Sequence, residues 1–74
     1  MRKLSVVKFE RLRRGITVRE VAEAAGVKPQ KYRVFEGGEK YRYLTSDELL
    51  GVSACIGVPR DMIADDRGAP RMLA

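Results

Sequence analysis

The sequence TVREVAEAAGVKPQKYRVFE, residues 17–36, predicts two short helices joined by a tight turn. Thr17 and Glu20 have the spacing of a capping box, in which the threonine oxygen and the glutamate carboxylate each bond a free backbone N–H. Gly26 stands where the first helix should end in a left-handed residue. Pro29 suits the first position of the next helix, because its missing N–H costs nothing there. We therefore expect one helix on each side of Gly26, the second over residues 29–36.

Three further helices are predicted around this pair. Apolar residues at helical spacing indicate a first helix over residues 4–14, with Leu12 on its inner face, and a fourth over residues 46–56. Ser46 is the expected N-cap of the fourth helix, and a short fifth helix should begin near Pro59. A chain of 74 residues has the size of one small domain. We expect an all-α, compact five-helix domain over residues 1–64 and a flexible C-terminal tail over residues 65–74.

The composition argues against several classes of protein. The single cysteine excludes an internal disulfide, and the absence of histidine removes the usual zinc sites and the Ser/His and Cys/His catalytic arrangements. We therefore expect no enzyme activity, no metal and no cofactor. The N-terminal residues become charged too soon for a secretory signal, and no apolar run reaches the ~18 residues of a membrane-spanning helix. These features predict a cytoplasmic protein without a membrane partner.

Positive charge is concentrated in the part of the chain that contains the predicted helix pair. The formal net charge is +5. Residues 1–45 contain 12 Lys/Arg against 5 Asp/Glu, a balance of +7, whereas residues 46–74 contain 3 against 5, a balance of −2. A polyanion would meet the basic part first, and its attraction would weaken as salt rises.

The predicted helices and the turns between them contain an ordered set of residues: Arg11, Gly15, Ala22, Gly26, Val27, Tyr32, Phe35, Glu36, Gly38, Leu49 and Ile56-Gly57-Val58. From about Val7 to Ile63 the chain thereby resembles the Cro/repressor family of DNA-binding domains, also called XRE-like. The resemblance implies a lambda-repressor-like fold with a helix-turn-helix. It also implies that Arg11 pairs with Glu36 as a structural brace, which would give a partner to an arginine on an otherwise apolar helix face.

The resemblance further implies which side chains meet DNA. The base-reading candidates, at the start of the family's recognition helix, are Lys28, Pro29, Gln30 and Val34. The candidates for contact with the DNA backbone are Arg19, Lys31, Arg33, Lys40 and Arg42. Two of these positions depart from the family pattern, since Pro29 offers only apolar contact and Lys28 stands where a small polar N-cap is more usual. Residues 41–43 could add a DNA contact or cover the edge of the core.

These features together predict a sequence-specific double-stranded DNA-binding transcriptional regulator. In this family such a protein is most often a repressor that binds a near-palindromic operator as a homodimer. We expect no small-molecule ligand, and a phage regulator, an antitoxin and a restriction–modification controller all fit. The alternative is a protein-interaction adaptor or antirepressor that keeps the fold without reading DNA. The residues that could form the dimer surface, or only complete the monomer core, are Val58, Met62, Ile63, Met72 and Leu73.

Overall fold

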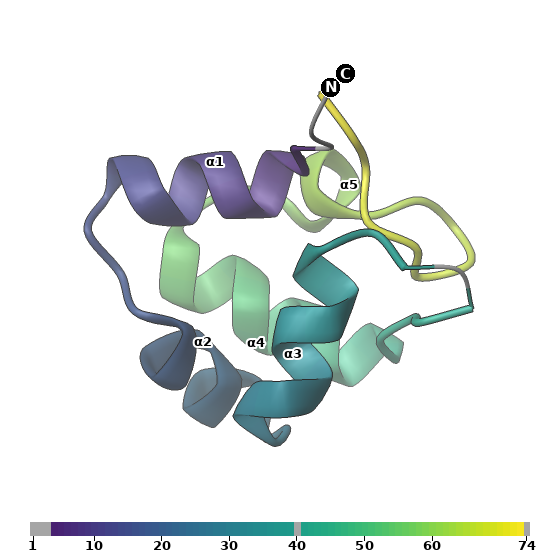
Figure 1. The fold of residues 1–74 in the computed structure, drawn as a ribbon. Helices are drawn as coiled ribbons and strands as arrows, with labels where there is room; N and C mark the ends of the chain where they lie inside the picture. Colours follow the sequence, from purple (N-terminus) through teal and green to yellow (C-terminus); the bar gives the residue numbers. More distant parts are fainter. Residues whose placement is uncertain (1–3, 40, 74) are drawn as a thin grey trace.

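The computed structural model describes residues 4–39 and 41–73, and this part of the chain forms five helices (Figure 1). In chain order they are α1 (Val6–Arg13), α2 (Val18–Ala25), α3 (Pro29–Glu36), α4 (Ser46–Ile56) and α5 (Arg60–Ile63). The prediction of a small all-α domain with five helices is confirmed. None of the helices formed by the described residues is long and apolar enough to cross a membrane.

The helix pair at residues 17–36 forms through the expected local interactions. Thr17 Oγ1 accepts the Glu20 N–H at 3.1 Å, and the Glu20 carboxylate accepts the Thr17 N–H at 3.1 Å, which completes the capping box of α2. Gly26 ends α2 at φ 73°, a left-handed conformation that costs glycine little. Because Pro29 begins α3, the chain turns between the helices within residues 26–28.

The start of α4 differs from the prediction by one residue. Thr45, rather than Ser46, is the N-cap, because Thr45 Oγ1 accepts the Glu48 N–H at 3.2 Å. The Glu48 carboxylate accepts the Thr45 N–H in return at 2.9 Å. A capping box requires the acidic residue three positions after the N-cap, and only Thr45 has that spacing to Glu48.

The first helix is shorter than predicted, and its first turn depends on a buried serine. Ser5 is the N-cap of α1, and its Oγ accepts the Lys8 N–H at 3.2 Å. The same hydroxyl donates to the Glu36 carbonyl at 2.8 Å, so it joins the start of α1 to the end of α3. Leu12 was expected on the inner face but is 57 % exposed, because α1 directs only Val7 and Arg11 fully inward.

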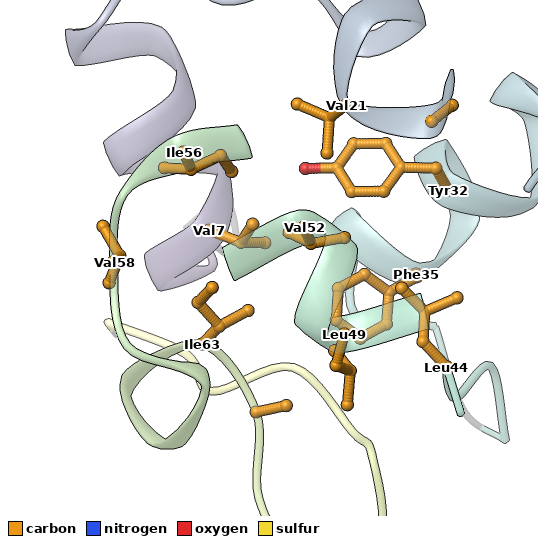
Figure 2. Packing of buried hydrophobic residues seen from close by; sticks show 12 residues of the cluster. Val7, Val21, Tyr32, Phe35, Leu44, Leu49, Val52, Ile56, Val58 and Ile63 are labelled. Atoms are coloured by element: carbon orange, nitrogen blue, oxygen red, sulfur yellow. The ribbon is translucent and has the colours of Figure 1, made fainter. Parts of the chain in front are cut away.

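All five helices contribute side chains to the core, and most of its larger side chains are labelled in Figure 2. Tyr32 and Phe35 of α3 are both buried, with ring centroids 6.2 Å apart. Leu49 and Val52 of α4 have no exposed surface, and Ile63 of α5 is equally buried. Burial of these side chains is the main favourable contribution to folding, at roughly 1.5–3 kcal/mol for each large aliphatic residue.

Close approach of α2 to α4 depends on a glycine in the middle of α4. A Cβ on Gly51 would lie 2.5 Å from the Ala24 carbonyl oxygen and 2.7 Å from Ala25 Cα, both of which are backbone atoms of α2. Backbone atoms cannot rotate away as a side-chain end can, so only glycine lets these helices pack at this distance. This requirement offsets the cost of about 1 kcal/mol that glycine carries inside a helix.

The C-terminal residues, predicted as a flexible tail outside the domain, are bound to it along their length. The Val6 N–H donates to the Arg71 carbonyl at 2.9 Å, the Leu73 N–H to the Leu4 carbonyl at 2.7 Å, and the Arg71 N–H to the Ile63 carbonyl at 2.8 Å. The first and last described residues therefore lie side by side (Figure 1). The expectation of a tail overlooked the unpaired backbone groups of residues 4–6, which this segment satisfies.

Candidate nucleic-acid interface

Helix α3 is amphipathic, because its buried residues lie on one face and its exposed polar residues on another. Tyr32 and Phe35 point into the core, and the half-buried Val27 packs against the same cluster from the turn before α3. Lys28, Gln30 and Lys31 remain exposed at the start of the helix. A helix fixed by one face and carrying long polar side chains on the other can enter a groove without losing its own packing.

The outer face of α3 and the loop that follows it enclose a shallow hollow of about 650 Å³. From α3 and its N-cap the hollow is lined by Lys28, Gln30, Lys31, Val34 and Phe35, and from the loop by Glu39, Tyr41, Arg42 and Tyr43. Three of the predicted base-reading residues thus share one surface with two of the predicted backbone contacts. The cations on this surface outnumber its single carboxylate, which favours an anionic ligand.

Lys31 has a partner within the protein. Its Nζ donates to the two carboxylate oxygens of Glu48 at 3.2 and 3.4 Å, and about half of the Lys31 side chain is exposed. The pKa of Glu48 is held below its usual value, first by the Thr45 backbone N–H and then by Lys31. The Glu48 carboxylate therefore reduces the positive charge that Lys31 presents to any other anion.

The remaining predicted DNA contacts lie outside the hollow or outside the described residues. Pro29 and Arg33, four residues apart on one side of α3, are exposed but do not line it. Arg19 is exposed in the first turn of α2. Lys40 lies outside the described residues, so its predicted contact has no structural counterpart here.

The end of α3 is held by the ion pair that the family resemblance implies. Arg11 Nε donates to Glu36 Oε2 and Arg11 Nη2 to Glu36 Oε1, both at 2.8 Å. Arg11 Nη1 also donates to the Ile16 carbonyl at 2.8 Å, so one guanidinium ties α1 to the α1–α2 turn and to α3. Both residues are buried, and the Glu36 carboxylate raises the pKa of Arg11. Two parallel bonds of this kind fix orientation as well as distance.

The Tyr32 hydroxyl is a buried polar group beside this pair. It has no hydrogen-bond partner of good geometry among the described residues. Burial is the main reason that the pKa of Tyr32 is raised, and the neighbouring Glu36 carboxylate adds to the effect. In the sequence Tyr32 is one of the residues that support the family resemblance, and nothing in its spacing indicates that its hydroxyl would be left unpaired.

The residues considered for a dimer surface divide into two groups. Val58 and Ile63 are buried and complete the monomer core. Met62 is 54 % exposed and Leu73 is 52 % exposed, while Met72 is half-buried. Among these five candidates, Met62 and Leu73 are therefore the ones whose side chains a second copy could cover.

Replacing Lys28 by serine should raise the free energy of unfolding. Lys28 is the N-cap of α3, with φ −70° and ψ 143°, and its side chain makes no capping bond. A serine oxygen at this position can accept an N–H of the first turn, for a gain of about 1 kcal/mol in the free energy of unfolding. Lys28→Ala is the matched control, because it removes the same cation and adds no cap. Equal melting temperatures for the two variants would contradict this view of the helix start.

Comparison with family models, with curated proteins and with solved structures finds no match for this chain.

Proposed function

We propose that this protein is a sequence-specific double-stranded DNA-binding transcriptional regulator of the helix-turn-helix class. In this proposal α3 enters the major groove, where Lys28, Gln30 and Val34 meet base edges. Arg42 in the loop and Lys31 contact phosphates beside that groove, together with Arg19 and Arg33. The protein acts in the cytoplasm, as a repressor, and represses by occupying its site.

The main support for this proposal is the surface that α3 shares with the loop that follows it. Gln30 is exposed in the first turn of α3, and no side-chain bond to another described residue engages it. Glutamine offers a donor and an acceptor in the geometry that adenine presents in the major groove. Lys31 and Arg42, the proposed phosphate contacts, line the same hollow as Gln30 and Lys28, the proposed base-reading residues.

A homodimer completes the proposal. Two copies related by a twofold axis would present two α3 helices to one face of a duplex, about 34 Å apart. Met62 and Leu73, the exposed apolar residues near α5 and the C-terminal end, are the proposed contact. An adaptor that keeps the fold without reading DNA has no need for Gln30 and Lys31 on its surface, and absence of duplex binding would favour it.

Replacing Lys31 and its partner Glu48 should change DNA affinity in opposite directions. Lys31→Ala should weaken binding to every duplex alike and reduce the slope of log K against log salt by about 1, because one phosphate contact is lost. Glu48→Gln keeps the capping box, since glutamine serves at that position, but removes the carboxylate that competes with phosphate. We expect it to bind every duplex more tightly, measured by fluorescence anisotropy at several salt concentrations. Weaker binding by Glu48→Gln would contradict a phosphate role for Lys31.

A further inference from the structure

The C-terminal segment, residues 65–73, contacts both ends of the loop that borders the hollow. At the far end of the loop the Leu44 N–H donates to the Gly68 carbonyl at 3.2 Å. At its start a Cβ on Gly38 would lie 3.1 Å from the Met72 sulfur, so the Met72 side chain packs directly against this glycine. The described residues of loop 38–44 are therefore held by a segment that is distant in sequence.

The same segment also holds the side of the loop that faces away from α3. Arg67 lies over the Tyr43 ring, with its guanidinium carbon 5.9 Å from the ring centroid, a distance at which a cation is attracted to the aromatic face. Tyr41 and Tyr43 line the large hollow against α3 and also a smaller one of about 310 Å³ against Pro70 and Met72. The loop therefore lies between α3 and the C-terminal segment.

Contact between the segment and the loop requires a glycine at position 68. Gly68 is buried at φ +91°, and a Cβ there would lie 2.3 Å from the Leu44 carbonyl oxygen. Any other residue must therefore push residues 65–73 and the loop apart. The segment itself cannot yield easily, because the Asp65 carboxylate accepts the N–H groups of Arg67 and Ala69 at 2.9 and 3.0 Å and thereby fixes the turn around Gly68.

We propose that residues 65–73 position the loop for its contacts with DNA phosphates, with Gly68 and Arg67 as the positioning residues and Arg42 as the contact. This inference rests on the proposed function. If the segment moves away from Leu44, the loop loses its support opposite α3, and Arg42 no longer shares a surface with Lys31. Binding then falls through loss of a phosphate contact, while base reading by α3 is unchanged.

The test compares Gly68→Ala with Gly57→Ala. Both glycines have positive φ, at 91° and 81°, but a Cβ on Gly57 meets no atom within 4 Å. Gly57 also ends α4, whereas Leu44 lies just before the start of that helix, so the control strains the backbone away from the loop. Both variants are measured below their melting temperatures, on a random-sequence duplex at several salt concentrations.

We expect Gly68→Ala to bind about tenfold more weakly than Gly57→Ala and to show a salt slope smaller by about 1. A partly unfolded sample would lower the apparent affinity but not the slope. Equal affinities and equal salt slopes for the two variants would contradict the positioning role of residues 65–73 and would leave the proposed function standing. Failure of the unchanged protein to bind any duplex would overturn the proposed function, and this inference with it.

Two substitutions at Arg67 separate positioning from net charge. Arg67→Lys keeps a cation over Tyr43 and should bind as the unchanged protein does, whereas Arg67→Ala should bind more weakly. Arg13→Ala is the charge control, because it removes an exposed arginine from α1. Equal losses for Arg67→Ala and Arg13→Ala would contradict a positioning role for Arg67.

Discussion

Replacing Glu36 by alanine should lower the free energy of unfolding by about 3 kcal/mol, since it leaves the buried Arg11 without the carboxylate that two of its nitrogens bind. For a domain of this size that loss corresponds to a fall of roughly 15 °C in melting temperature. The bond from Ser5 to the Glu36 carbonyl involves the backbone and remains in the variant. The loss of stability therefore comes from the ion pair. Thermal unfolding followed by circular dichroism measures this loss.

Glu10→Ala is the matched control for the brace. Glu10 pairs with Arg13 and Arg14, and these two hydrogen bonds hold the pKa of Glu10 below its usual value. Both arginines keep exposed side-chain surface, 59 % for Arg13 and 32 % for Arg14, and ion pairs that reach solvent contribute little to stability, so the melting temperature should barely change. Replacing Arg11 and Glu36 together by methionine should recover most of the lost stability, because no charge is then left unpaired. A melting temperature for Glu36→Ala equal to that of Glu10→Ala would contradict the brace.

Replacing Gln30 by alanine should cost ~1–3 kcal/mol of binding to the specific site and relax the preference at one base pair. Stability should be unchanged, because Gln30 is exposed and alanine is a good helix former. Binding to random DNA should also be unchanged, because phosphate contacts supply most of that affinity. Titration of the preferred duplex and of a scrambled duplex with the same variant separates these effects.

Lys31→Ala provides the contrast for the Gln30 result. Lys31→Ala should weaken binding to the preferred and the scrambled duplex alike, whereas Gln30→Ala should weaken binding to the preferred duplex only. If both substitutions lower the affinities for the two duplexes to the same extent, the division into base-reading and phosphate-binding residues is wrong.

The parts of the fold that were predictable depend on residues close together in the sequence. Thr17, Glu20, Gly26 and Pro29 determine the ends of α2 and α3 through bonds and backbone angles within a few positions. The prediction of Ser46 as the N-cap of α4 was wrong, although the local signal was present: Thr45 has the capping-box spacing to Glu48 and Ser46 does not. For the candidate site the outward position of Gln30 and Lys31 follows from the inward position of Tyr32 and Phe35.

The parts that were missed depend on contacts between distant residues. Gly51 and Gly68 resemble ordinary glycines in the sequence, and their need for small size comes from the backbone at Ala24 and at Leu44. The pairing of Lys31 with Glu48 likewise joins α3 to α4 and has no local signature. The supposed tail contains Gly68 and Pro70, which suggest a loose chain until the backbone partners of the segment are known.

Selection of bound sites from a pool of random duplex DNA shows whether α3 reads base sequence. We predict enrichment of one near-palindromic sequence, with half-site centres about one helical turn, ~34 Å, apart. It also predicts that Gln30→Ala relaxes the selected sequence at one symmetry-related pair of positions. A pool that stays random after selection, while the protein remains folded, would contradict the claim that α3 reads DNA.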